Sequence, residues 1–223
     1  MTHLNLWEQL LYYYGHNGQY VLSQFSRHFL ISAYGVILAA IIGIPIGIFI
    51  AHHTRLNGVV IGIANVIQTV PSLAMLSIIM IGLGLGVNTV IVTVFLYSLL
   101  PIIKNTDAGM RAVDPTLLDA GTGMGMTRWQ LLRLVEIPLS MSMVMAGLRN
   151  ALVLAIGITA IGTFVGAGGL GDIIIRGTNA TNGTAIILAG ALPTALMAII
   201  LDLILAWVEK KVAPNAQGAK AGA

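Results

Sequence analysis

The sequence predicts an all-α integral membrane protein, a polytopic helical bundle, and three observations support that prediction. Apolar residues make up 57% of the 223 positions, and residues with a formal charge make up only 9%, against about 25% in soluble domains. So few polar side chains cannot cover the exterior of a soluble globule of this composition. The apolar stretches are also continuous, whereas the strands of an outer-membrane barrel alternate. A disordered chain is excluded because disordered chains are polar.

Five apolar stretches are candidate membrane spans, since a helix needs about 20 residues to cross the hydrocarbon core. The first, residues 29–51, contains no Asp, Glu, Lys or Arg. Residues 56–103 also lack a formal charge, but one helix of that length would measure about 70 Å. The chain must therefore fold back, and the glycine-rich residues 82–88 are the expected turn. We predict five transmembrane helices, at residues 29–51, 58–81, 87–103, 139–163 and 184–208.

The positions of Lys and Arg predict the orientation of the chain, because cytoplasmic loops carry the excess of positive charge. With the C-terminus inside, eight of the 11 basic residues lie on the cytoplasmic side. Only Arg27 and Arg176 then lie outside, and Arg149 lies within the fourth span. We therefore expect the N-terminus outside and the C-terminus in the cytoplasm. The expected parts are an extracellular segment at 1–28, a transmembrane domain at 29–208 that includes a cytoplasmic loop at 104–138, and a cytoplasmic tail at 209–223.

The cytoplasmic loop is predicted to form two short helices that meet near Gly125. Asp114 followed by Pro115 is a typical helix start, with an N-cap and a proline at the first helical position. Thr127 and Gln130 have the spacing of a capping box and begin the second helix. Both helices have apolar faces. Composition alone leaves two interpretations open: the faces rest on the bundle, or they bind a cytoplasmic partner.

Residues 119–138 resemble the cytoplasmic signature of binding-protein-dependent ABC importer permeases, which reads E-A-A, three residues, Gly, nine residues, I-x-L-P. The spacing is kept, with four conservative departures, in Asp119-Ala120-Gly121, Gly125 and Val135-Glu136-Ile137-Pro138. Glycine at 121 is expected to loosen the first helix by up to about 1 kcal/mol relative to alanine. The resemblance implies that this segment couples the membrane helices to a separate ATPase through Leu118, Asp119, Ala120, Gly121, Gly125 and Pro138.

Two further strings resemble the branch of this family that imports quaternary-amine osmoprotectants such as glycine betaine, carnitine and choline. They are IQTVPSLAML at residues 67–76 and FVGAGGLGDIIIRGTN at residues 164–179. The function that this implies is the permease subunit of an ATP-driven importer in the cell membrane. Two alternatives stay open at this point, a permease for an amino acid such as methionine and an ion-coupled secondary transporter.

The same resemblance implies several partners and a non-catalytic role for this chain. No phosphate-binding G-x-x-x-x-G-K-[ST] motif occurs in the sequence. We therefore expect no cofactor in this chain, with ATP and Mg²⁺ bound by cytoplasmic ATPase subunits. The other expected partners are a second permease chain, identical or related, and an extracellular or lipid-anchored solute-binding protein. Nucleic acid is not an expected partner.

Polar residues at membrane depth are the remaining candidates for function. Pro71 interrupts the second span, and its neighbours Gln68, Thr69 and Ser72 either line a translocation path or bond their own helix. Asp202 is the one acid within the last span, where an ion-coupled transporter would need coupling acids. We expect Lys210, Lys211 or interfacial water to satisfy Asp202, and Arg149 to reach toward the inner headgroups.

Small residues and the absence of cysteine complete the sequence picture. Glycine pairs four residues apart allow close helix packing in lipid, and they occur at 43/47, 58/62 and 162/166. The string GAGGLG at residues 166–171 is expected to form a tight outer loop rather than a dinucleotide site, because a membrane span precedes it. The chain has no cysteine. No metal site is expected, since the adjacent His52 and His53 point about 100° apart on a helix.

Overall fold

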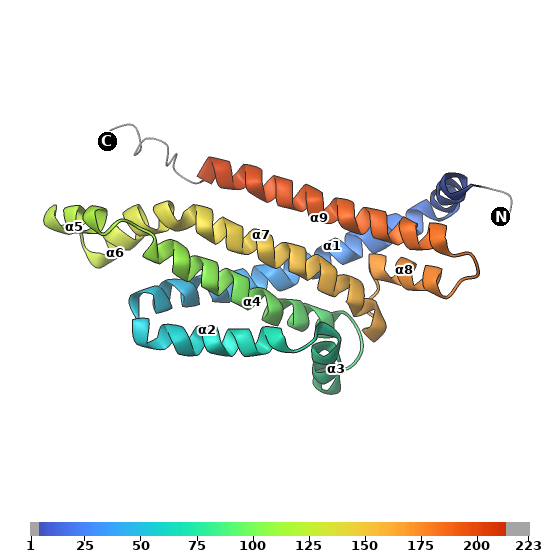
Figure 1. Cartoon of the computed structure of the whole chain (residues 1–223), viewed down its shortest axis with the longest axis horizontal. Coiled ribbons are helices and arrows are strands. Elements are labelled where there is room, and N and C mark those ends of the chain that lie inside the picture. The colour runs from blue at the N-terminus through green and yellow to red at the C-terminus, as the bar shows by residue number, and fades with distance from the viewer. Residues whose placement is uncertain (1–4, 213–223) are drawn as a thin grey trace.

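The computed structural model describes residues 5–212, and all regular structure within that range is helical. The predicted all-α bundle is thus confirmed. Figure 1 shows an elongated molecule whose long helices run side by side, with α5 and α6 at one end and α8 at the other. The elements are α1 (Leu6–His52), α2 (Thr54–Thr69), α3 (Ser72–Leu83), α4 (Val87–Arg111), α5 (Pro115–Gly123), α6 (Arg128–Leu131), η1 (Leu132–Glu136), α7 (Ile137–Ile161), η2 (Gly162–Val165), α8 (Leu170–Thr178) and α9 (Thr184–Val212).

Four helical segments among the described residues are long and apolar enough to cross a membrane, namely α1, α4, residues 128–165 and α9. The predicted second span is present as two helices, α2 and α3, bent by 96°. Counting this pair as one span makes five. The bend lies at Pro71, which has no N–H for a helical hydrogen bond and holds the preceding Val70 in an extended conformation. The predicted turn is confirmed between α3 and α4, with Gly84 and Gly86 both at positive φ.

The first helix extends beyond the predicted first span, residues 29–51, toward the N-terminus. Helix α1 starts at Leu6, with Asn5 as its N-cap and Glu8 completing a capping box. It continues through the predicted extracellular segment, apart from a local break at Asn17. This part of the helix contains Glu8 and Arg27, so it does not belong to a charge-free stretch. Of the predicted tail, residues 209–212 end α9, and residues 213–223 lie outside the described range.

Glycines set how closely α1 approaches α4. A Cβ at Gly43 would lie 3.0 Å from Ile102, and a Cβ at Gly47 would lie 2.6 Å from Thr106. A Cβ at Gly162 would likewise lie 2.6 Å from the Val90 side chain. The pair at 58/62 and Gly166 have open space at the Cβ position within the described chain. The predicted close packing is therefore confirmed for the first pair and for one member of the third. It is not observed for the second pair.

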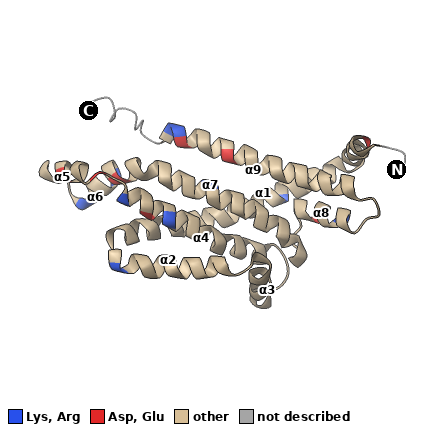
Figure 2. Ribbon diagram, viewed as in Figure 1, with Lys and Arg blue, Asp and Glu red and all other residues tan. Residues whose placement is uncertain are grey.

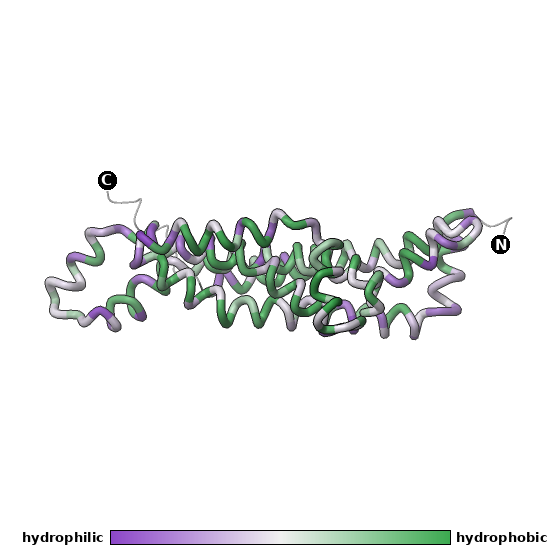
Figure 3. The backbone as a smooth tube through the Cα atoms, turned by 90° about the horizontal axis from the view of Figure 1, so that it is seen from below, coloured by the Kyte–Doolittle hydropathy of each residue, from purple (hydrophilic) through white to green (hydrophobic). Residues whose placement is uncertain are grey.

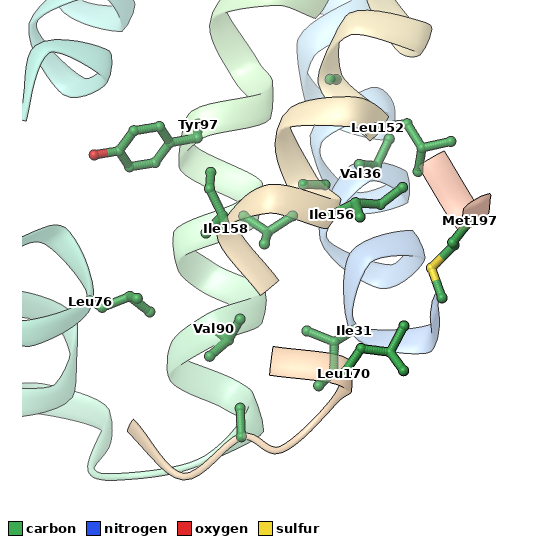
Figure 4. Close-up of a cluster of buried hydrophobic side chains, with 14 of the residues drawn as sticks. Ile31, Val36, Leu76, Val90, Tyr97, Leu152, Ile156, Ile158, Leu170 and Met197 are labelled. Atoms are coloured by element: carbon green, nitrogen blue, oxygen red, sulfur yellow. The ribbon is translucent and has the colours of Figure 1, made fainter. Parts of the chain in front are cut away.

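The core lies where α1, α4 and α7 meet, and residues of α3, α8 and α9 close it. Figure 4 shows these side chains packed between the helices, including Ile31, Val90, Ile156 and Leu170. Large apolar side chains also cover the outside of the bundle, as expected for helices that face lipid. Figure 3 shows the apolar residues concentrated along the middle of the molecule. Since lipid is as apolar as the core, close packing rather than removal from water holds such helices together.

Candidate functional site

The α5–α6 hairpin, residues 114–131, has local caps that explain where its helices begin. The Asp114 carboxylate accepts a hydrogen bond from the backbone N–H of Thr116 at 2.8 Å, and Pro115 is the first helical residue. The backbone N–H and hydroxyl of Thr116 lower the pKa of this carboxyl. Thr127 and Gln130 exchange side-chain to backbone hydrogen bonds of 2.8 and 3.3 Å. Both predicted helix starts are confirmed.

Gly125 is the joint between the two helices, and its φ of 83° lies in the region that favours glycine. No atom lies within 4 Å of a Cβ built at this position, so the requirement is one of backbone conformation. Gly121 has the opposite requirement. Its Cβ would lie 2.6 Å from Leu131 Cδ1, so glycine lets α5 pack directly on α6. The expectation that Gly121 loosens the first helix of the loop rested on helix propensity alone, which does not include this contact.

The predicted coupling residues divide into an exposed group and a packed group. Asp119, Ala120 and Gly125 are exposed, whereas Gly121 is buried and Leu118 is half-buried. Pro138 is half-buried in the first turn of α7, on the other side of the hairpin. The sequence left open whether the apolar faces rest on the bundle or bind a partner. Part of each face packs within the hairpin, while other large side chains stay exposed, namely Leu117, Met124, Trp129 and Leu134.

The second predicted group lies around the bend between α2 and α3. Tyr97 of α4 donates its O–H to the carbonyl of Val70 at this bend, and Figure 4 shows its ring pointing away from α4. Gln68 and Ser72 are half-buried, and Thr69 and Pro71 are exposed. The Thr69 hydroxyl bonds the Val66 carbonyl of its own helix at 2.7 Å. The structure thus brings these four residues together, and sequence reasoning missed Tyr97, which is 27 positions away.

The charged residues within the spans have other partners than expected. Arg149 of α7 bonds Asp202 of α9 through two parallel N–H···O contacts of 2.8 and 2.9 Å. Its third nitrogen reaches Glu209 at 3.2 Å. The expected pairing of Asp202 with Lys210 or Lys211 is therefore wrong, and so is the expectation that Arg149 extends to the headgroups. Helix α9 runs alongside α7, which puts the guanidinium beside the acid.

At the opposite end, the predicted tight loop at residues 166–171 is confirmed. Gly166, Gly168 and Gly169 all have positive φ. The loop returns the chain to α1, where Gln24 accepts a hydrogen bond from the N–H of Gly169 at 2.6 Å. The buried His28 accepts one from Leu170 N at 3.2 Å and faces the Ile156 carbonyl at 3.0 Å. Nothing in the local pattern of residues 24 and 28 indicated these contacts.

A polar cluster next to this loop ties α8 to α1. Asp172 accepts hydrogen bonds from the hydroxyl of Tyr20 and, at 2.8 Å, from Arg176. The guanidinium of Arg176 also lies 4.9 Å from the centre of the Tyr20 ring, within cation–π range. Burial raises the pKa of the Asp172 carboxyl, but the hydrogen bonds from Tyr20 and Arg176 outweigh it and hold the pKa below its usual range. Within residues 5–212, no three His, Asp or Glu side chains lie close enough to hold a metal ion.

Comparison with known proteins gives consistent matches over most of the chain. The model of a family described as binding-protein-dependent transport system inner membrane component matches residues 43–214. The carnitine transport permease protein OpuCD of Listeria monocytogenes is 66% identical over 207 residues, covering 93% of both chains. The glycine betaine/carnitine/choline transport system permease protein OpuCD of Bacillus subtilis is 63% identical over 207 residues, covering 93% of this chain and 90% of the relative.

A solved structure has the same fold. The inward-facing MetNI methionine ABC transporter matches with a TM-score of 0.78 and 18% sequence identity, covering 87% of this chain and 97% of that one. At this level of identity the likeness is one of fold alone.

Proposed function

We propose a function for this chain from one premise: it belongs to the family of binding-protein-dependent transport system inner membrane components. The protein is the membrane-spanning permease subunit of an ATP-driven importer of quaternary-amine compatible solutes such as glycine betaine, carnitine and choline. The observation that carries this is the identity of 63–66%, over 90% or more of each chain, to relatives named for carnitine and for glycine betaine, carnitine and choline. The methionine alternative has only a likeness of fold in its support.

The α5–α6 hairpin is the surface that receives the ATPase in this proposal. It lies beyond the ends of the long helices (Figure 1), and its exposed apolar side chains suit a groove on a partner. Leu118, Asp119, Ala120 and the joint at Gly125 form or position the contact. Gly121 holds α5 on α6, and Pro138 marks the start of α7. The ATPase subunits bind ATP and Mg²⁺ and supply the energy, while this chain contributes no catalytic residue.

The proposed orientation puts the hairpin in the cytoplasm and the N-terminus outside. Its support is that basic residues gather at the hairpin end of the described chain, as Figure 2 shows for Lys and Arg, and cytoplasmic segments carry such an excess. Two permease chains, identical or related, pair around the translocation path. An extracellular or lipid-anchored solute-binding protein delivers the solute at the α8 end.

The bend between α2 and α3 borders the translocation path in this proposal. Gln68, Thr69, Pro71 and Ser72 lie at the break between two helices, and they provide the carbonyl and side-chain oxygens that a polar solute needs at membrane depth. Thr69 bonds its own helix, so its contribution is to the shape of the bend.

Solute uptake by the reconstituted complex tests this function. The permease, its ATPase and its binding protein are placed in vesicles, and entry of radiolabelled glycine betaine, carnitine, choline and methionine is measured. We expect uptake of a quaternary amine that requires ATP and continues when ion gradients are collapsed. Uptake of methionine alone would favour the amino-acid permease, and uptake driven by an ion gradient without ATP would favour a secondary transporter.

A further inference from the structure

The last turn of α1 is held by two side chains that flank the α5–α6 hairpin in sequence. Arg111, the final residue of α4, precedes the hairpin, and its guanidinium donates to the carbonyl of Ile50 at 3.0 Å. Glu136, the final residue of η1, follows the hairpin, and its carboxylate lies 2.9 Å from Nε2 of His52. The segments on either side of the hairpin are therefore both bonded to residues 50–52.

Each of these contacts is itself fixed by a neighbouring group. Arg111 is oriented by a second hydrogen bond, from its Nε to Asp107 one turn earlier, at 2.8 Å. His52 faces Glu136 with one ring nitrogen and the carbonyl of Ile48 with the other, at 2.9 Å. The Glu136 side chain is only 8% exposed, and a carboxylate that buried needs a partner. The two links therefore have defined geometry and are not loose surface contacts.

The segment that carries Glu136 is a π-helical turn, residues 132–136, in which the N–H of Ile137 reaches the carbonyl of Leu132. Such single π turns are rare and occur frequently at functional sites. Here the turn lies between α6 and α7, where the hairpin joins a membrane helix. It ends at the residue that bonds α1.

Helix α1, which both links contact, leads directly to α2 and so to the bend between α2 and α3. Only His53 separates the end of α1 from the start of α2 at Thr54, and α2 ends at the bend beside Pro71. Next to the links, Gly47 lets α1 pack on Thr106 of α4 with no room for a Cβ. A displacement of the hairpin that moves Arg111 and Glu136 must therefore move the end of α1, and with it the start of α2.

We propose that Arg111 and Glu136 are positioning residues that transmit movement of the α5–α6 hairpin to the junction of α1 and α2. The inference rests on the proposed function, in which the ATPase moves the hairpin. Coupling between distant sites is carried by such chains of packed side chains and hydrogen bonds. The functional contribution of the two residues lies in coupling ATP hydrolysis to solute movement, and the binding of the ATPase does not depend on them.

The test measures solute uptake per ATP hydrolysed, by the complete complex in vesicles, together with the amount of ATPase that co-purifies. Glu136→Met removes the acceptor for His52, and Glu136→Gln keeps an oxygen at the same place. His52→Ala removes the donor, and His53→Ala is its matched control. His53 also bonds a carbonyl one turn earlier, that of Phe49 at 2.8 Å, but it makes no ion pair with Glu136.

We expect Glu136→Met and His52→Ala to bind the ATPase as the parent does and to lower uptake per ATP by about threefold or more, within the range that changes along a coupling network produce. Glu136→Gln and His53→Ala should keep the parental ratio. If one of Glu136→Met and His52→Ala fails to accumulate, the other decides, because the first leaves a half-exposed imidazole without its acceptor and the second leaves a buried carboxylate without its donor. A parental ratio in His52→Ala would overturn the inference. Failure of the parent complex to retain its ATPase would instead overturn the proposed function.

Discussion

Arg149 and Asp202 face each other across α7 and α9 with two parallel hydrogen bonds of 2.8 and 2.9 Å. This fork-to-fork geometry is the most specific pairing that an arginine makes with a carboxylate. Glu209 adds a third contact at 3.2 Å. The only acid within the last predicted span is thus paired with a cation, which is not the arrangement expected of a freely titrating coupling acid in an ion-driven transporter.

Removal of Arg149 alone should lower the stability of the protein more than removal of both Arg149 and Asp202. Arg149→Leu leaves the carboxylates of Asp202 and Glu209 without their cation, whereas Arg149→Leu with Asp202→Leu removes one of these unpaired charges. We expect the thermal midpoint of the purified permease to fall further in the single variant than in the double one. Ser142→Ala, which removes a hydroxyl that bonds Glu209, is the control. Equal midpoints for the single and double variants would show that an unpaired Asp202 carboxylate does not destabilise the protein.

Asp202→Asn should retain substantial ATP-driven uptake when its amount in the membrane matches that of the parent. The amide keeps an oxygen for Arg149, and the proposed mechanism takes its energy from ATP. Uptake is measured in vesicles with ATP held constant and the ion gradients collapsed. Complete loss of uptake by a stable Asp202→Asn variant would revive the ion-coupled alternative.

Gly125→Val should separate insertion into the membrane from binding of the ATPase. A β-branched residue at a φ of 83° is disfavoured by about 1–2 kcal/mol. The backbone at residue 125 should therefore adopt another conformation, which changes the direction of α5 relative to α6. The helices of the bundle do not depend on this joint. We expect normal accumulation together with loss of ATPase co-purification and of transport. Gly82→Val, at the opposite end with open space around it, should retain both.

The orientation of the chain in the membrane can be tested with single cysteines introduced at two positions of nearly equal exposure, because the native chain has no cysteine. Met124 in the hairpin is 77% exposed, and Leu85 in the turn before α4 is 74% exposed. In intact cells an impermeant thiol reagent should label Leu85→Cys and leave Met124→Cys unlabelled until the membrane is opened. The reverse pattern would contradict both the orientation and the proposed site of ATPase docking.

The link between α8 and α1 should weaken in acid. The pKa of Asp172 is held below its usual range, so its contribution to stability is complete above the usual carboxyl pKa and is lost as the pH falls through the lowered value. Asp172→Asn should therefore have a lower thermal midpoint than the parent from pH 8 to pH 5, and the difference should shrink toward pH 3. A difference that is constant over this whole range would show that the carboxylate charge is not responsible.

Tyr97→Phe tests the bend between α2 and α3. The change removes the O–H that bonds the Val70 carbonyl and leaves that half-buried acceptor without this partner, at a cost of up to about 1 kcal/mol. We expect a lower thermal midpoint and reduced uptake with normal binding of the ATPase. Tyr34→Phe, at an exposed position on α1, is the matched control. Parental uptake by Tyr97→Phe would remove the bend from the proposed mechanism.

Features that depend on near neighbours in the chain could be predicted from the sequence. The N-cap at Asp114, the capping box at Thr127 and the joint at Gly125 each involve residues within four positions of one another, and all three were predicted correctly. The same holds for the turn between α3 and α4. The charge-free window at residues 29–51 marks the apolar part of the first helix, but it does not indicate that the helix itself begins at Leu6.

Pairings between distant residues were decided by the tertiary structure alone. Arg149 meets an acid 53 positions away, and Tyr97, Glu136 and His28 bond groups on other helices. Which side chains meet depends on how far each helix is rotated and how closely it approaches its neighbour. Those quantities are set by contacts such as that of Gly47 with Thr106, and no local pattern records them. The sequence therefore determined that apolar helices with a capped hairpin would form, and packing decided which polar groups the helices bring together, because a hydrogen bond requires its two atoms within about 3 Å.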